Sequence, residues 1–151
     1  MKMLICTDGS ESSRKAIEEG AKIAKGCSVK EVTLIHVYEF ITQYSFLSNG
    51  KMGSADSEDN EQFRKLQETS KEEAKKVLIE GSKLLEEKNI KAGTVLKEGQ
   101  TSETITRFAS EERVDMIVMG SKGHTGLKKL ILGSVSNAVL HQASTNVLIV
   151  K

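Results

Sequence analysis

The sequence predicts an α/β protein in which helices cover both faces of a parallel sheet. Short apolar runs alternate along the chain with longer segments whose apolar residues recur every three or four positions. The runs at 3–6, 115–120 and 146–151 are almost continuously apolar, which is typical of strands buried on both faces. A regular alternation of strands and helices favours parallel strands joined by helical crossovers. With 151 residues, the chain fits a single domain spanning 1–151.

Each element follows from a local pattern. The first strand is expected at 3–6, and the first helix runs from Ser10, a good N-cap residue, to about Gly26. A second strand at 32–37 is rich in β-branched residues. The remaining elements are expected as a helix at 61–89, a strand at 92–96 that is less apolar and therefore nearer a sheet edge, a helix at 101–112, a strand at 115–120, a helix at 134–143 and a strand at 146–151.

The region between the second and third strands combines a loop and a long helix. Residues 38–60 show no sustained period and are expected to form a long loop, which at this length is either functional or poorly ordered. In the helix at 61–89, Lys and Glu surround a single apolar stripe, which predicts a charged, solvated face opposite a buried one. The stripe consists of Phe63, Leu66, Ser70, Ala74, Val77, Leu78, Gly81, Leu84 and Leu85.

Composition and charge exclude several classes of protein. The 22 Lys and Arg nearly balance the 21 Asp and Glu, so the chain lacks the basic field typical of nucleic-acid binders. No apolar run approaches the roughly 18 residues of a membrane span, and the N-terminal run is too short for a signal peptide. We therefore expect a soluble cytoplasmic protein that contacts neither nucleic acid nor membrane. Cys6 and Cys27 suggest no disulfide framework, and no set of Cys, His and carboxylate residues has metal-ligand spacing.

A glycine-rich segment, MGSKGHTGLKKLILGSVSNAVL at 119–140, follows the fourth strand. Open parallel sheets bind ligands beyond the carboxyl ends of their strands, and glycines there let main-chain N–H groups approach an anion. Gly133 and Ser134 then open a helix, whose N-terminus offers unpaired N–H groups and a partial positive charge. The hydroxyls of Ser134 and Ser136 add donors in the first turn. Singly, these residues could equally end a strand or cap a helix; together they predict a phosphate-binding site.

The spacing of these glycines is specific. Gly120, Gly123, Gly133 and Ser134 form G-x2-G-x9-G-[ST], which is neither a P-loop nor the dinucleotide motif G-x-G-x-x-G. It resembles the ATP-binding signature of the universal stress protein family. The segments TDGSESS, LIHVY, DMIVMGSKG and NVLIVK extend the resemblance over essentially the whole chain. The family implies a Rossmann-like three-layer fold with strand order 3-2-1-4-5, a homodimer, and ATP held at the ends of the first and fourth strands.

The resemblance also implies roles for individual residues. Asp8 would contact adenine, and the main chain of Val37 would contact the same base. Thr7 would either turn toward the ligand or cap the first strand. Ribose and phosphates would be held by Met119, Gly120, Gly123, Gly133, Ser134, Val135 and Ser136. Cys6 and Asn146 stand where the family often has proline, and neither change removes a donor from the expected site.

Other polar residues and the last strand have two interpretations each. Lys122 and His124 are expected either to steady a phosphate or to be solvated. His36 is expected to be packed or hydrogen-bonded rather than a ligand, and His141 to lie at the surface or an interface. The apolar strand at 147–150 would pair with a second copy to give a homodimer, unless a loop or helix covers it.

These observations predict an ATP-binding regulatory or stress-response protein. Its ligand would be ATP, or ADP or AMP, and one Mg²⁺ or Mn²⁺ bridging the phosphates fits the same site. Near the predicted site there is no obvious nucleophile–base pair or second carboxylate set, so no catalytic residue is assigned and ATP hydrolysis would be slow at most. Two alternatives stay open: an ATP-cleaving or adenylating enzyme, and a flavin carrier. Adenylating enzymes of related folds usually carry a glycine-serine phosphate loop after the first strand, where this chain has the acidic segment TDGSESS. A flavin carrier needs aromatic side chains to stack on the flavin, and these are scarce here.

Overall fold

A parallel sheet forms the middle layer of the protein. The computed structural model describes residues 1–27, 29–39, 57–124 and 132–151, with the main chain alone described at 57–60, 62 and 63. Within these residues, five strands pair in the order β3-β2-β1-β4-β5, and every pair is parallel. The predicted fold class and strand order are confirmed.

The strands and helices alternate along the chain as predicted. In chain order the described elements are β1 (Lys2–Cys6), α1 (Glu11–Gly26), β2 (Glu31–Tyr38), α3 (Ser57–Glu87), β3 (Gly93–Glu98), α4 (Thr101–Glu111), β4 (Met116–Gly120), α5 (Ser134–Gln142) and β5 (Asn146–Val150). Their bounds lie close to the predicted ones, except at the start of α3.

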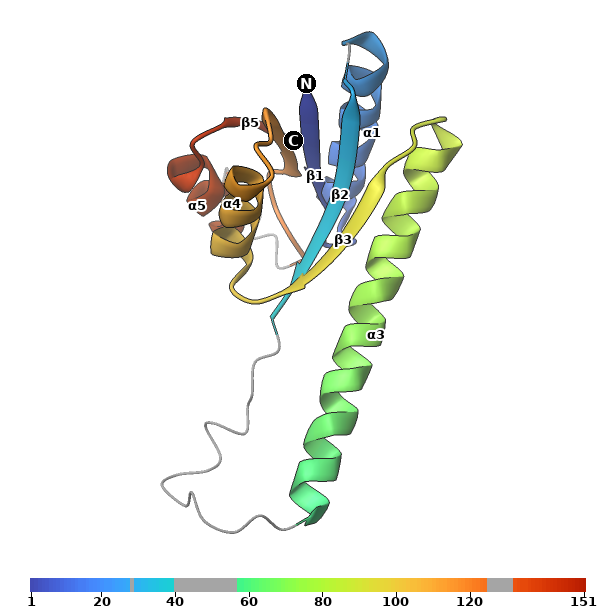
Figure 1. Cartoon of the computed structure of the whole chain (residues 1–151), viewed down its shortest axis with the longest axis vertical. Helices are drawn as coiled ribbons and strands as arrows, with labels where there is room; N and C mark the ends of the chain where they lie inside the picture. The colour runs from blue at the N-terminus through green and yellow to red at the C-terminus, as the bar shows by residue number, and fades with distance from the viewer. Residues whose placement is uncertain (28, 40–56, 125–131) are drawn as a thin grey trace.

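Helices cover both faces of the sheet (Figure 1). Helices α1 and α3 pack on one face, and α4 and α5 pack on the other. Successive residues of a strand point to opposite faces, so Ile5 of β1 joins the core under α1 and α3, whereas Leu4 joins the core under α4 and α5. Both side chains are fully buried, which explains why this strand is an unbroken apolar run.

Helix α1 is fixed at its start and along its length. The hydroxyl of Ser10 accepts the N–H of Ser13 at 3.2 Å, as the predicted N-cap should. Further along, Gly20 faces Ile5, and a Cβ on Gly20 would stand 2.6 Å from the Cδ1 of Ile5. The missing side chain lets α1 lie close to the sheet, which brings its first turn to the carboxyl ends of β1 and β4.

Helix α3 is longer than predicted. It begins at Ser57 rather than at 61, so part of the loop expected at 38–60 is helical, and residues 40–56 of that loop lie outside the described part of the chain. A helix of 31 residues is about 46 Å long, whereas an eight-residue strand such as β2 spans about 26 Å.

The prediction of one continuous buried stripe along α3 is wrong for the first half of the helix. Ala74, Leu78 and Leu85 are buried, but Leu66 is 53% exposed. Figure 1 shows the first half of α3 extending beyond the carboxyl ends of the strands. The stripe therefore reaches the core only in the second half of the helix, where the sheet lies beneath it.

The two edges of the sheet are β3 and β5. Strand β3 is exposed at both ends and half-buried in the middle, which agrees with its predicted edge position. In β5, Val147 to Val150 are all half-buried, and the strand is paired on one side with β4.

Two further expectations from the sequence concern disulfide bonds and membrane-spanning segments. Cys6 is buried and Cys27 is exposed, and both are free thiols. In the described ranges, no helix combines the length and the apolar character that crossing a membrane requires.

Candidate functional site

A cavity of about 420 Å³ opens where β1 and β4 end. These strands are neighbours in the sheet, but the helices that follow them, α1 and α5, lie on opposite faces. Open parallel sheets bind ligands at such a switch point, because the two segments that leave the strands run to opposite faces of the sheet and leave a crevice between them. The volume is within the range of small-molecule sites.

All the residues predicted for the site line this one cavity: Thr7, Asp8, Val37, Met119, Gly120, Gly123, Gly133, Ser134, Val135 and Ser136. Lys122 and His124 also line it. Sequence reasoning missed a further set, Cys6, Ser13, Ile35, Thr101 and Ile105. Thr101 and Ile105 belong to α4, and nothing in their local sequence connects α4 with the glycine-rich segment; the sheet order alone brings them there.

One wall of the cavity is apolar. It is formed by side chains of β2, α4, β4 and α5, namely Ile35, Val37, Ile105, Met119 and Val135. Cys6 belongs with them, because burial, aided by the nearby Asp8, raises the pKa of its thiol to about 12 and keeps it neutral. Such a wall suits a flat, weakly polar group.

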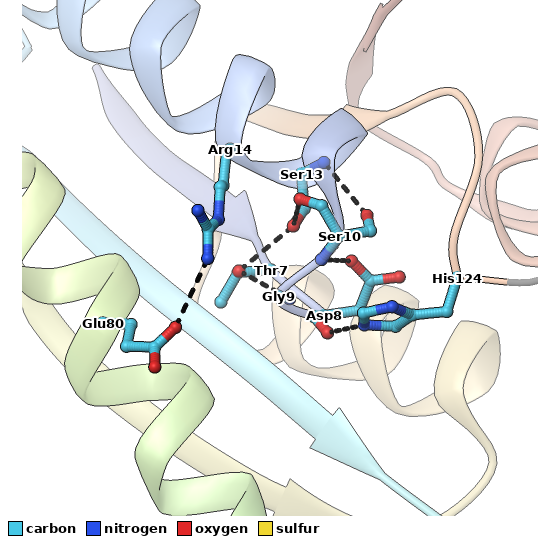
Figure 2. Close-up of polar contacts among 8 residues, drawn as sticks. All are labelled: Thr7, Asp8, Gly9, Ser10, Ser13, Arg14, Glu80 and His124. Atoms are coloured by element: carbon cyan, nitrogen blue, oxygen red, sulfur yellow. Dashed lines mark hydrogen bonds and ion pairs between the residues drawn. The ribbon is translucent and has the colours of Figure 1, made fainter.

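The turn after β1 presents the carboxylate of Asp8 (Figure 2). Its Oδ1 accepts the N–H of Ser10 at 2.9 Å, and Gly9 has φ of +80°, which favours glycine. Asp8 therefore stabilises the turn, but it uses only one of its two carboxylate oxygens to do so. Its Oδ2 lies 2.8 Å from the position that a Cβ on Gly123 would take, and has no hydrogen-bond partner among the described residues.

On the cavity side, the main chain of Val37 makes no hydrogen bond to any described residue. The N–H of Thr7 donates to the carbonyl of Ile35 at 3.0 Å, so Ile35 turns its main-chain groups toward β1. Val37 lies two residues further along β2 and has the same orientation, but β1 ends at Cys6. Its N–H and carbonyl therefore face the cavity, where an adenine-like edge could pair with them.

The three glycines of the motif are there for different reasons. A Cβ on Gly120 would stand 2.6 Å from the carbonyl carbon of Ser12, so this glycine lets β4 pass under α1. At Gly123 a Cβ would crowd Asp8. At Gly133 it would make only ordinary contacts, the nearest at 3.4 Å. Packing against main chain thus demands the first glycine, whereas the second leaves room for one oxygen of the Asp8 carboxylate.

The N-terminus of α5 presents main-chain donors to the cavity. Gly133 is the N-cap, no described side chain caps the helix, and the first intrahelical bond runs from the Asn137 N–H to the Gly133 carbonyl at 3.0 Å. The N–H groups of 134–136 precede that bond and have no hydrogen-bond partner among the described residues, so they could donate to an anion. The hydroxyl of Ser136 is already used, because it donates to the carbonyl of Ser121 at 2.9 Å. Any phosphate contact of Ser136 would be made by its main-chain N–H.

Two histidines lie against the turn after β1. Nδ1 of His36 is 2.7 Å from the carbonyl oxygen of Thr7, as expected for a hydrogen-bonded histidine. Burial lowers the pKa of His36 below its usual value, against smaller opposing effects of Thr7 and Asp8. Nε2 of His124 is 2.7 Å from the carbonyl oxygen of Asp8, a contact that neither interpretation of His124 included. His141 is exposed on α5, as predicted for a surface residue.

The arrangement provides donors for an anion and an acceptor for an amino group. Asp8 is the only acidic residue among the described ones that line the cavity. Over the described ranges, no group of three His, Cys, Asp or Glu residues is placed to hold a metal ion. These residues suit the binding of a charged, partly aromatic ligand.

The fold defines a Rossmann-like α/β protein with a cavity at the switch point of its sheet. A sequence profile described as "Universal stress protein family" matches residues 1–151. The chain belongs to the universal stress protein family, which confirms the resemblance inferred from its motifs.

Individual relatives agree with this assignment. Universal stress protein MJ0531 of Methanocaldococcus jannaschii is 33% identical over 99% of this chain and 81% of its own length. Universal stress protein YxiE of Bacillus subtilis is 30% identical over 99% of this chain and 98% of its own length.

Solved structures share the fold. The structure of protein MJ0577 superposes with a TM-score of 0.79 at 31% identity, covering 99% of this chain and 94% of that one. A universal stress protein in complex with cAMP gives 0.68 at 21% identity, covering 100% and 97%. The universal stress protein of Archaeoglobus fulgidus in complex with dAMP gives 0.68 at 18% identity, covering 100% and 98%.

Proposed function

We propose that this chain binds an adenine nucleotide, ATP or else ADP or AMP, at the carboxyl ends of β1 and β4. The observation that carries the proposal is the pairing of two kinds of group around one cavity. The Asp8 carboxylate and the main chain of Val37 lie beside an apolar wall, and the N–H groups of 134–136, which have no partner among the described residues, line the same space. The base of a nucleotide matches the first kind of group, and its phosphates match the second.

Asp8 and Val37 would recognise the base. A carboxylate oxygen accepts from the amino group of adenine, while a main-chain N–H and carbonyl match the acceptor and donor on its Watson–Crick edge. Ile35, Ile105 and Met119 would pack against the ring. All these groups already border the cavity, so binding of the base needs no rearrangement of the sheet.

The start of α5 would hold the phosphates. Its free N–H groups and helix dipole favour an anion, and Gly120 and Gly123 line the same side of the cavity. One Mg²⁺ or Mn²⁺ would accompany ATP. Because Asp8 is the sole acidic residue among the described lining residues, that ion would take its ligands from phosphate and water rather than from a protein cage.

Two solved structures of this fold support the ligand class. One is a complex with cAMP and the other a complex with dAMP, and both ligands contain adenine. At 21% and 18% identity, they support an adenine nucleotide in general and leave the number of phosphates to experiment.

The role of such a site would be regulatory. Strong catalysis requires paired acid–base groups or a metal cage, and Asp8 is a single carboxylate whose Oδ1 is held by Ser10. We expect the protein to report nucleotide occupancy through its conformation or a partner, with slow ATP hydrolysis at most.

Strand β5 would pair with a second copy. The N–H of Ser121 donates to the carbonyl of Val150 at 2.7 Å, so even-numbered residues of β5 face β4 and odd-numbered ones face outward. The outward-facing N–H and carbonyl groups are those of Val147 and Ile149. Sedimentation should give the mass of a dimer, and Ile149→Pro, which removes one outward N–H, should give a monomer.

The ligand can be identified directly. Freshly purified protein would be denatured and the released small molecules identified by mass spectrometry; an adenine nucleotide near one per chain is the expected result. Release of inorganic phosphate or pyrophosphate at enzymatic rates would favour the ATP-cleaving alternative, and a yellow protein would favour the flavin carrier.

A glycine variant tests the position of the site. Gly123→Val would place its Cβ 2.8 Å from Oδ2 of Asp8 and should abolish binding of ATP and AMP in calorimetry. Gly26→Val is the control, since no atom lies within 4 Å of a Cβ there. Equal affinity of the two variants would count against this cavity.

A further inference from the structure

Two neighbouring carbonyl groups of the turn after β1 are each held by a histidine, one on β2 and one in the segment after β4. Nδ1 of His36, on β2, lies 2.7 Å from the oxygen of Thr7, and Nε2 of His124, after β4, lies 2.7 Å from the oxygen of Asp8. A carbonyl oxygen can only accept, so each of these ring nitrogens carries the proton and donates. Figure 2 shows the imidazole of His124 reaching across to the main chain of Asp8.

The contact from His124 holds a peptide that has little else to hold it. The peptide between Asp8 and Gly9 is followed by a glycine with φ of +80°, and glycine adopts either sign of φ at low cost. On its other side, the Gly9 N–H donates to the Thr7 hydroxyl at 3.3 Å, a longer contact than the 2.7 Å made by His124. Without His124, the longer contact to Thr7 is the only hydrogen bond left on this peptide among the described residues.

Holding that carbonyl also helps to fix the Asp8 carboxylate, because the ψ angle of Asp8 sets where the N–H of Ser10 lies relative to Oδ1. Oδ1 of Asp8 is fixed by the N–H of Ser10 at 2.9 Å, and Oδ2 is directed toward Gly123 at the cavity. The direction of Oδ2 depends on the main chain of Asp8, which His124 holds. Asp8 is therefore placed by a residue more than a hundred positions later in the chain.

We propose that His124 is a positioning residue for base recognition: by holding the Asp8 carbonyl, it directs the Asp8 carboxylate at the exocyclic amino group of adenine. This inference rests on the proposed function. It makes His124 a determinant of selectivity between 6-amino and 6-oxo purines, because hypoxanthine carries an acceptor where adenine carries a donor, and would face the carboxylate with a second oxygen.

The test is a selectivity ratio measured on the full chain. Calorimetry would give dissociation constants for AMP and IMP, and for ATP and ITP, with the natural protein and with His124→Ala. The natural protein should prefer the 6-amino nucleotide by about tenfold or more, and His124→Ala should lose most of that preference. His141→Ala, which removes an exposed histidine from α5, is the matched control and should keep the natural ratio.

Two conservative variants separate positioning from simple packing. The amide nitrogen of Gln reaches about as far as Nε2 of histidine, so His124→Gln should restore the selectivity. Asn carries the same amide but is too short to reach the Asp8 carbonyl, so His124→Asn should behave like Ala. Asp8→Asn should abolish the preference, and adding His124→Ala to it should change the ratio no further, because both act through one carboxylate.

The outcomes distinguish the inference from the proposed function. Failure of the natural protein to bind any purine nucleotide would overturn both. Binding without a preference for the 6-amino purines, or a His124→Ala variant that weakens AMP and IMP equally, would overturn the inference and leave nucleotide binding standing. If His124→Ala lowers the unfolding temperature, the comparison of His124→Gln with His124→Asn decides the question, and equal selectivity of these two would also overturn it.

Discussion

Gly120, the last residue of β4, lies directly against Ser12 in the first turn of α1. A Cβ on Gly120 would stand 2.6 Å from both the carbonyl carbon and Oγ of Ser12. The same Oγ accepts the main-chain N–H of Lys122 at 3.3 Å. One residue of α1 thus fixes the start of the glycine-rich segment, and a close contact with main-chain atoms cannot be relieved by turning a side chain.

Gly120→Ala should therefore destabilise the protein. Overpacking against main chain typically costs about 1–3 kcal/mol, and we expect a loss in this range in urea unfolding. Gly26→Ala is the control, since it has no atom within 4 Å of the new Cβ and should be neutral or slightly stabilising. If both variants unfolded at the same urea concentration, α1 and β4 would not be in rigid contact.

Two leucines of α3 should respond very differently to truncation. Leu78 is 7% exposed and packs into the core, so Leu78→Ala should cost about 2–5 kcal/mol. Leu66 is 53% exposed on the part of the helix beyond the sheet, so Leu66→Ala should cost less than about 0.5 kcal/mol. Chemical denaturation of both variants measures the difference. A large loss from Leu66→Ala would mean that the first half of α3 is packed against something.

His36 should make the protein less stable in acid. Burial lowers its pKa below the usual 6.5, so the unfolded chain takes up this proton at a higher pH than the folded protein does. Between those two pKa values the unfolded state binds more protons, so stability is full above about pH 6.5 and falls as the pH drops toward the folded pKa.

The contribution of His36 can be isolated by comparison. Urea unfolding would be followed from about pH 8 to about pH 5 for the natural protein and for His36→Asn. Asn keeps an N–H donor near the position of Nδ1 but does not titrate, so the variant should lose less stability over this range. An identical pH dependence in the two proteins would show that His36 does not titrate differently on folding.

The two cysteines should differ in reactivity. Burial and the charge of Asp8 raise the pKa of Cys6 to about 12, so almost no thiolate forms there at about pH 8, whereas Cys27 is exposed. Iodoacetamide should therefore add one label, at Cys27, to the native protein and a second in urea. Mass spectrometry of the intact chain and of its peptides counts and locates the labels. Labelling of Cys6 in the native protein would contradict its burial.

The sheet and the motif residues of the site could be predicted because their signals are local. Leu4 and Ile5 face different cores, which produces the unbroken apolar run that identified β1. Asp8 and Gly123 follow shortly after β1 and β4, and parallel strands place those ends at one edge of the sheet. Short-range pattern and topology were therefore enough to bring them together.

Features without a local signal could not be predicted. The first four residues of α3, SEDN at 57–60, include no apolar residue, so their composition resembles that of a loop. Thr101 and Ile105 reach the cavity only because α4 crosses the sheet. The contact of His124 with Asp8 depends on how two loops approach each other, which no spacing within either loop reveals.

The central position of β1 has a consequence for how the protein is made. Met3 of β1 pairs with Met116 of β4, so the middle of the sheet cannot form until β4, a late strand in the chain, has been made. While a nascent chain still lacks α5, it holds Asp8 without the amides of 134–136 and cannot gain stability from a bound ligand. Protection of newly made protein by its ligand would begin only once α5 has been made and has folded onto the sheet.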